Sequence, residues 1–137
     1  MKQGDFITRI FYEDTDAGGI VYYANYLRYL ERARTELLRE LGYSQHALLQ
    51  QGIAFAVRSA QIEYLKPAKL DDLLTIQTTI ESLGRAQLSF SQCIFRDETR
   101  LLDAKIRVAC IDPGLGKPIA MPKAMYQQFL SLVTHAP

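Results

Sequence analysis

Two carboxylates, Asp14 and Asp16, stand close together in a segment that ends in the glycine pair Gly18 and Gly19. A helical pattern begins close behind them, near Tyr23. The first turn of a helix has unpaired N–H groups and a partial positive charge, which can hold a carbonyl oxygen as it becomes negative. A carboxylate that faces a carbonyl polarised in this way could perform acyl transfer or hydrolysis. We therefore expect this junction to be the active site.

The two aspartates differ in their surroundings. Asp14 lies further from the glycines, where its side chain can accept backbone N–H bonds as an Asx turn, so we expect it to brace the loop. Asp16 lies beside the glycines, and the apolar residues that follow would limit the access of water. From position alone a bracing role is an equal alternative for Asp16, but these neighbours favour Asp16 as the residue that performs chemistry.

Metal and nucleotide motifs do not match this sequence. The aspartate segment begins like a calcium loop, but a glycine pair replaces an expected ligand and Asn25 stands where a bidentate glutamate belongs. Residues 114–118 lack the leading glycine and the Ser or Thr of a phosphate-binding loop. We therefore expect no metal site and no nucleotide-binding loop.

Histidine and cysteine are poorly placed for nucleophilic catalysis. There is no Gly-x-Ser-x-Gly motif, and the two histidines, His46 and His135, fall in a short surface helix and in the C-terminal tail. The two cysteines, Cys93 and Cys110, fall within strand patterns, where cysteine is usually a small buried hydrophobe. Two cysteines cannot build a disulfide framework, so we expect a reducing, cytoplasmic setting.

The composition is that of an ordinary globular domain. The 137 residues are 48% hydrophobic and 23% charged, with a formal net charge of +1, which gives no reason to expect nucleic-acid binding. Residues 1–5 do not resemble a secretory signal, and no apolar run approaches the ~20 residues that span a bilayer. We expect one domain over residues 1–137, with a core of about residues 6–133.

The periodicity of apolar residues predicts an α+β fold. A stripe with helical spacing runs from residue 23 to residue 41 and ends at Gly42, and a shorter helix lies between Ser44 and Gly52. In the strand that follows, the alternation changes phase near Arg58 and Ser59, which predicts a β-bulge there. The expected strands are residues 6–12, 55–64, 74–80, 88–94 and 102–110, and a last helix follows Pro122.

The order of these elements predicts an antiparallel sheet. We interpret the three connections between the last four strands as hairpins. The helix at residues 23–41 is the only long amphipathic element, so we expect it to lie across the sheet.

Residues 12–26 resemble the signature of hotdog-fold acyl-CoA thioesterases of the 4-hydroxybenzoyl-CoA thioesterase family. Residues 31–34 and the turn at residues 66–72 resemble the YbgC-type branch, whose members are associated with the Tol-Pal system. The resemblance extends from about Phe6 to the terminal helix. It implies a long helix wrapped by an antiparallel sheet of about five strands.

The resemblance also implies an assembly and a substrate. It implies homodimers whose sheets join edge to edge, often paired into tetramers, with the active site at the dimer interface. The substrate would be an acyl-CoA or an acyl carrier protein thioester, and no cofactor would be needed because coenzyme A is part of the substrate.

Two residues match catalytic positions of this family. Asp16 matches the catalytic aspartate, which would attack the thioester carbon or activate a water. Tyr23 matches the position whose backbone N–H polarises the thioester carbonyl; many YbgC-type proteins have histidine there, so an imidazole role is absent from this chain.

Further substrate contacts are expected around this pair. We expect Gly19, Val21 and Tyr22 to contact substrate, together with Ser59 at a bulge that faces the loop. Arg85 matches a corner where relatives place basic residues near the coenzyme A nucleotide. Simple packing is the alternative for Ser59, and solvated surface charge is the alternative for Arg85.

Two other functions remain open from the sequence. The chain could be a noncatalytic acyl-binding or scaffold protein of the cell envelope, because a fold alone does not establish activity. It could also be a hotdog dehydratase, although such enzymes use a histidine with an acid and the aspartate loop contains no histidine.

Overall fold

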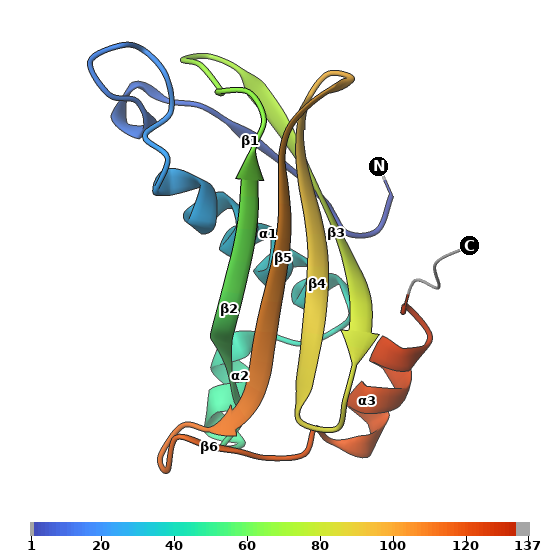
Figure 1. Cartoon of the computed structure of the whole chain (residues 1–137). Coiled ribbons are helices and arrows are strands. Elements are labelled where there is room, and N and C mark those ends of the chain that lie inside the picture. The colour runs from blue at the N-terminus through green and yellow to red at the C-terminus, as the bar shows by residue number, and fades with distance from the viewer. Residues whose placement is uncertain (1, 134–137) are drawn as a thin grey trace.

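The computed structural model describes residues 2–133 and contains one sheet and three α-helices (Figure 1). The tail from Thr134, including His135, lies outside the described residues. No helix in the described part of the chain is long and apolar enough to cross a membrane. The elements in chain order are β1 (Asp5–Arg9), a 3₁₀ turn (Tyr12–Asp14), α1 (Asn25–Glu40), α2 (Gln45–Gln50), β2 (Ala54–Tyr64), β3 (Leu73–Leu83), β4 (Gln87–Arg96), β5 (Thr99–Asp112), β6 (Lys117–Pro118) and α3 (Lys123–Leu130).

The sheet is antiparallel and wraps around α1, which confirms the predicted α+β hotdog fold. Its strand order is β1-β3-β4-β5-β2, and the two-residue strand β6 extends the sheet at the end of β5. In Figure 1, α1 lies behind the curved sheet, and β2 forms a free edge on the left. The core therefore lies between one long helix and the concave face of the sheet.

One predicted connection is wrong. β2 and β3 are not hairpin neighbours, because β4 and β5 lie between them in the sheet. The connection at residues 65–72 is much longer than those at residues 84–86 and 97–98, so it can cross the end of the sheet whereas they form tight hairpins. This crossing segment bonds to the aspartate loop, as described below.

α1 matches the predicted helix except at its ends: it begins at Asn25 instead of residue 23 and ends at Glu40 instead of residue 41. Burying a large apolar side chain contributes about 1.5–3 kcal/mol before entropy is counted. The inward stripe of α1 comprises Tyr26, Tyr29, Leu30, Ala33, Leu37 and Leu38. The helix ends in a Schellman motif: the Gly42 N–H donates to the Arg39 carbonyl at 3.0 Å and the Tyr43 N–H to the Leu38 carbonyl at 2.9 Å. Gly42 has φ of 95°, which explains the glycine.

The first strand is shorter than predicted. It ends at Arg9 rather than at Tyr12, because the Asp14 carboxylate accepts the Phe11 N–H at 2.8 Å and opens a 3₁₀ turn over residues 12–14. A side chain therefore takes the place of a ladder partner. Alternation of apolar residues cannot reveal such a competition.

The bulge and the short helix are confirmed. The register of β2 against β5 shifts between Val57 and Ser59, so Arg58 is the extra residue. The Ser44 hydroxyl accepts the Ala47 N–H at 3.1 Å and caps α2. The bulge lies near the middle of the free edge strand.

Candidate active site

The aspartate loop is a closed, hydrogen-bonded turn. A bridge between Thr15 and Val21 closes its base, and the Asp16 N–H donates to the Ile20 carbonyl at 3.0 Å. The Asp16 Oδ1 accepts the Gly18 N–H at 2.9 Å. Gly19 has φ of 75°, a left-handed conformation that favours glycine. The Asp16 side chain is exposed, and its Oδ2 has no hydrogen-bond partner among residues 2–133.

Asp14 joins three segments. Its Oδ2 accepts the Phe11 N–H at 2.8 Å. Its carbonyl oxygen accepts the Tyr22 N–H at 3.1 Å and the Asn25 side-chain amide at 2.9 Å. These contacts attach the loop to the end of β1 and to the start of α1, which is the arrangement that a brace requires.

The start of α1 leaves the Tyr23 and Ala24 amides free beside the loop. The helix begins at Asn25 rather than at Tyr23, but Tyr23 and Ala24 already form the turn that leads into it. The Asn25 N–H donates to the Tyr22 carbonyl at 2.9 Å and the Tyr26 N–H to the Tyr23 carbonyl at 3.3 Å. The Tyr23 N–H has no acceptor in the described part of the chain.

The crossing segment at residues 65–72 is hydrogen-bonded to the aspartate loop. The Val21 N–H donates to the Ala68 carbonyl at 2.9 Å, and the Leu70 N–H donates to the Gly19 carbonyl at 3.0 Å. The Ala68 N–H donates to the Tyr26 hydroxyl at 2.9 Å in a buried position. Burial raises the pKa of Tyr26, and the bond from Ala68 opposes that rise. The loop is therefore attached to α1 through Ala68.

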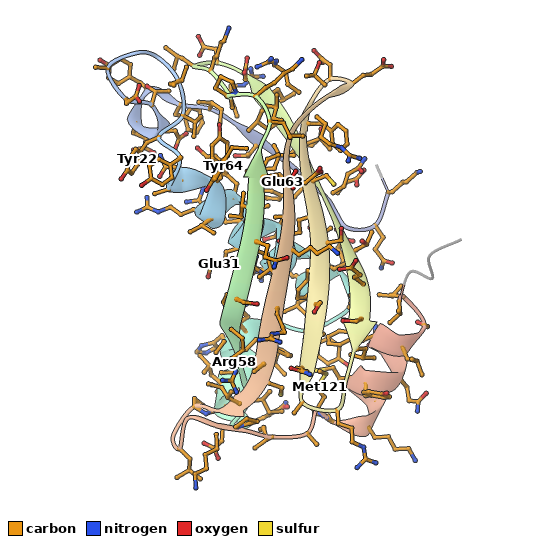
Figure 2. All side chains as sticks on the ribbon, viewed as in Figure 1. Tyr22, Glu31, Arg58, Glu63, Tyr64 and Met121 are labelled. Carbon is orange, nitrogen blue, oxygen red and sulfur yellow. The ribbon has the colours of Figure 1, made fainter. Side chains whose placement is uncertain are left out.

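Five tyrosine rings form a continuous row beside the loop. Ring centroids are 5.1 Å apart for Tyr22 and Tyr23, 6.3 Å for Tyr23 and Tyr64, 5.7 Å for Tyr64 and Tyr26, and 6.1 Å for Tyr26 and Tyr29. Figure 2 shows Tyr22 and Tyr64 near the same end of the molecule. The row connects the exposed surface at Tyr22 to the buried face of α1.

The innermost tyrosine is unusual. Tyr29 is 1% exposed, and its hydroxyl has no hydrogen-bond partner with acceptable geometry among the described residues. Burial raises the pKa of Tyr29, and the nearby Asp14 carboxylate raises it further. The hydroxyl thus lies beneath the bracing aspartate without a satisfied bond.

Several predicted site residues lie elsewhere. Val21 is 4% exposed, so only its backbone is available to a substrate. Tyr64, at the end of β2, meets the tyrosine row, and Ser59 lies five residues earlier, about 16 Å away along an extended strand. Within one chain, Ser59 therefore does not face the loop as the sequence predicted.

Arg85 lies far from the loop in the same chain. Its carbonyl accepts the Met121 N–H at 2.8 Å, and Figure 2 shows Met121 at the end of the molecule opposite to Tyr22. Arg85 borders a surface hollow with Lys123 and Tyr126. Within one chain the structure does not bring Arg85 and Asp16 together.

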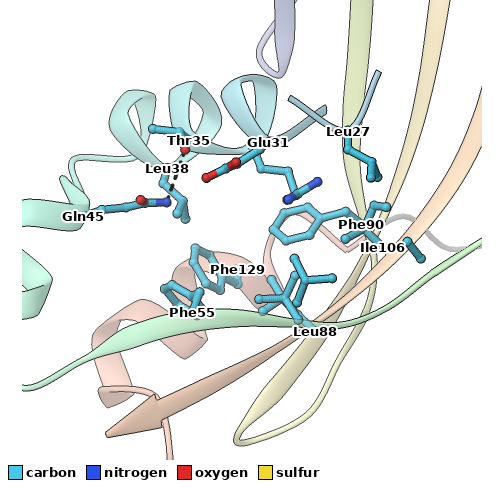
Figure 3. A pocket seen from close by; sticks show the side chains of 14 residues that line it. Leu27, Glu31, Thr35, Leu38, Gln45, Phe55, Leu88, Phe90, Ile106 and Phe129 are labelled. Atoms are coloured by element: carbon cyan, nitrogen blue, oxygen red, sulfur yellow. Dashed lines mark hydrogen bonds between the residues drawn. The ribbon is translucent and has the colours of Figure 1, made fainter. Parts of the chain in front are cut away.

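A cavity of about 400 Å³ lies between α1 and the sheet. Figure 3 shows Glu31, Thr35 and Leu38 on its helix side, opposite Phe55, Leu88 and Phe129. None of the predicted site residues lines this cavity, but Leu27 does, and Leu27 lies one helical turn after Tyr23. The lining residues are Leu27, Glu31, Arg34, Thr35, Leu38, Gln45, Phe55, Val57, Ala60, Leu88, Phe90, Ile106, Val108 and Phe129.

A buried polar residue that was not predicted from the sequence, Gln92, bonds to Arg34 on the cavity wall. Gln92 is 0% exposed and stands between Phe90 and Ile94 on the inward face of β4. Polar glutamine at an apolar position of an alternating strand was the signal that could have revealed it.

Comparisons with known proteins identify the family. A family model described as the thioesterase-like superfamily matches residues 12–129. The chain belongs to this superfamily. The resemblance to hotdog thioesterases is confirmed, and the prediction of a thioester hydrolase is confirmed as a class of enzyme.

Individual members of the thioesterase-like superfamily match over most of the chain. An acyl-CoA thioester hydrolase YbgC from Escherichia coli O6:H1 is 49% identical over 122 residues, which cover 88% of this chain and 91% of the relative. An acyl-CoA thioesterase YbgC from Haemophilus influenzae is 46% identical over 90% of this chain and 92% of its own length. The crystal structure of a probable thioesterase from Bartonella henselae has a TM-score of 0.81 and 40% identity, over 86% of this chain and 98% of that one.

Proposed function

We propose that this chain hydrolyses the thioester bond of acyl-CoA, releasing a free acid and the coenzyme A thiol. Asp16 is the nucleophile or the general base, and the Tyr23 N–H is the oxyanion site. The observation that carries the proposal is the free Tyr23 N–H at a helix start beside a carboxylate with an unpaired oxygen. The names of the relatives support the acyl-CoA substrate.

The proposed reaction has two routes that use the same groups. In one, an Asp16 oxygen attacks the thioester carbon, the C–S bond breaks, and water then hydrolyses the resulting anhydride. In the other, Asp16 takes a proton from a water that attacks the carbon directly. Negative charge develops on the carbonyl oxygen in both routes, and the Tyr23 N–H and the helix start stabilise it. The thiolate is a good leaving group, so no histidine acid is required, and the reaction needs no cofactor.

We also propose that two chains pair through β2. This strand is one of the two edges of the sheet, and its outward side has no strand partner in the described part of the chain. Val57 and Tyr64 on β2 and Leu27 on α1 are apolar side chains that are about half exposed, which is uncommon on an unprotected edge. An antiparallel β2 pair whose two-fold axis lies between Ser59 and Tyr64 would bring the bulge of one chain toward the loop of the other and would return Ser59 to the site.

The free thiols of Cys93 and Cys110 support a reducing, cytoplasmic location.

Acyl carrier protein thioesters are a second substrate class that the same chemistry could serve. We also propose that the chain folds as one domain, with a core of about residues 6–133.

The decisive experiment measures thiol release from short-chain, long-chain and aromatic acyl-CoAs and from acyl carrier protein thioesters. The wild type is expected to release thiol from at least one acyl-CoA. Asp16→Asn is expected to lower kcat about a hundredfold or more while its circular dichroism spectrum is unchanged.

A matched variant separates chemistry from loop bracing. Asp14→Asn should lower the thermal midpoint because it weakens the bond to the Phe11 N–H, which ties the loop to the segment after β1. Asp16→Asn weakens only the bond to the Gly18 N–H within the loop, so it should lower the midpoint less. Unchanged hydrolysis by Asp16→Asn would remove Asp16 from the mechanism. If the chain binds thioesters but hydrolyses none of them, it is an acyl-binding module instead.

A further inference from the structure

A chain of buried polar groups supports one arginine at the cavity between α1 and the sheet. The Gln92 side-chain amide donates to the Leu30 carbonyl at 3.0 Å and to the Thr78 hydroxyl at 2.9 Å. The Gln92 Oε1 accepts one N–H of the Arg34 guanidinium at 3.0 Å. Gln92 and Thr78 are 0% and 4% exposed, so these bonds hold the guanidinium from inside the core.

Such a network is an expensive way to fill a core position. Buried amides and hydroxyls lose their hydration, and the alternating pattern of β4 would accept an aliphatic side chain at position 92. Every hydrogen-bonding atom of the Gln92 side chain is used, and the result is a guanidinium held in a fixed place. The network therefore has the character of a support for Arg34.

The Arg34 side chain has donors to spare. A guanidinium carries five N–H donors, and only the bond to Gln92 is formed within the described residues. Arg34 lines the cavity, whose other walls are mainly apolar. Burial lowers the pKa of Arg34, and the charge of Glu31 opposes that change.

Glu31 lies one turn before Arg34 on the same wall of the cavity (Figure 3). The two side chains make no ion pair within 4.0 Å among the described residues. The wall thus presents donors from Arg34 and acceptors from Glu31. A hydroxyl group can accept from the first and donate to the second.

We propose that Arg34 and Glu31 form a specificity subsite for a hydroxyl group on the acyl chain of the substrate. This inference rests on the thioesterase function proposed above. A terminal methyl group would leave the Arg34 donors unpaired, and a terminal carboxylate would face the negative charge of Glu31. The favoured substrate is therefore a hydroxyacyl thioester.

The position of the subsite sets the length of that acyl chain. The Gln92 side chain bonds both the Arg34 guanidinium and the Leu30 carbonyl, and Leu30 lies seven residues after Tyr23, the proposed oxyanion site, which is about 10 Å along the helix axis. A short acyl group cannot reach from the helix start to Arg34. The hydroxyl must be carried at the far end of a medium-length chain.

The test compares matched thioesters that differ only at the far end. Octanoyl-CoA, ω-hydroxyoctanoyl-CoA and the ω-carboxyl analogue of the same length are assayed for kcat/KM. The hydroxyl compound should be preferred over octanoyl-CoA by about tenfold or more, because a hydrogen bond to a charged group is gained. The preference should disappear for butanoyl chains, which are too short, so the wild type alone supplies a test.

Variants locate the preference. Arg34→Met keeps a long, unbranched side chain but removes its donors. The ratio of kcat/KM for the hydroxyl compound to that for octanoyl-CoA should fall to about 1. Gln92→Leu should reduce the preference in the same direction because it releases the guanidinium from its support. Arg39→Met is the control: Arg39 is an exposed arginine on α1, paired with Glu36 at 3.4 Å and outside the cavity lining, so the preference should remain.

Each outcome has a distinct meaning. Equal kcat/KM for octanoyl-CoA and its ω-hydroxyl form overturns the subsite but leaves the thioesterase proposal intact, as does a preference for the carboxyl compound. Absence of turnover on all thioesters overturns the proposed function. In that case, calorimetric binding of non-hydrolysable thioether analogues still decides the subsite, because equal affinities for the methyl and hydroxyl analogues would overturn it.

Discussion

The backbone amide of Tyr23 is one of two free N–H groups at the start of α1. The Tyr22 N–H is taken by the Asp14 carbonyl and the Asn25 N–H by the Tyr22 carbonyl, whereas the N–H groups of Tyr23 and Ala24 have no acceptor in the described part of the chain. The chemistry proposed for Tyr23 therefore depends on its backbone and not on its phenol. This explains how the position could lack histidine and still serve a thioesterase.

Tyr23→Pro removes this N–H and should lower kcat about a hundredfold or more, the usual effect of losing one oxyanion donor. Proline is tolerated in the first turn of a helix, so the fold should be retained. Tyr23→Phe keeps the amide and should lose far less activity. Steady-state kinetics on both variants, with circular dichroism as the folding control, decide the matter; equal losses would assign the role to the side chain.

Cys93 makes stability depend on pH. Burial and the hydrogen bond to the Asp103 carboxylate raise the pKa of the Cys93 thiol from 9.0 to about 11. The unfolded chain loses this proton first, so the stabilisation is complete below about pH 9 and is lost as pH rises to about 11. The urea midpoint of the wild type should fall through this range more steeply than that of Cys93→Ala. Parallel curves would contradict the prediction.

At the scale of elements, sequence patterns predicted most of the fold. The bulge near Arg58 was predictable because an extra residue shifts the phase of the alternation. The end of β1 was not, because the Asp14 side chain competes for the Phe11 N–H. The path of residues 65–72 was not predictable either, since strand neighbours in space leave no trace in the period of each strand.

The hydrogen bond between Tyr26 and Ala68 joins α1 to the crossing segment. Tyr26→Phe leaves the Ala68 N–H unpaired in a buried position and should destabilise the fold by about 1–3 kcal/mol. Tyr29→Phe is a matched control on the same helix. It removes a buried hydroxyl without a partner, so it should be neutral or slightly stabilising. Urea denaturation measures both; equal free energies of unfolding for the two variants would contradict a stabilising bond between Tyr26 and Ala68.

At the scale of the whole molecule, the predicted site residues form one cluster and two outliers. The cluster contains Asp14, Asp16, Gly19 and the start of α1, which lie together because they are near one another in sequence. Ser59 and Arg85 lie on distant parts of the same chain from the loop, and under the proposed pairing their contribution would require a second copy. The cavity beside Arg34 could not be predicted from the sequence, because it exists only after β4, β5 and α1 have packed together.

Val57→Glu should convert a β2-paired dimer to a monomer, because a charge would be buried at the joined edges. Val57 is 55% exposed on the free edge strand. The control is Leu130→Glu on α3, which is 46% exposed and lies on the side of the sheet away from β2 (Figure 1). Light scattering after size exclusion gives the mass of each variant. A dimer that survives Val57→Glu alone would place the interface elsewhere.

The crossing segment also has a consequence for the order of folding. The aspartate loop bonds to Ala68 and Leu70, which lie about fifty residues further along the chain. The loop cannot reach its working shape until the chain has been folded through that long-range contact, and a slow, non-local step of this kind follows the local hairpins. Catalytic competence should therefore appear late in refolding, and local opening of residues 65–72 would inactivate the enzyme while β3, β4 and β5 remain paired.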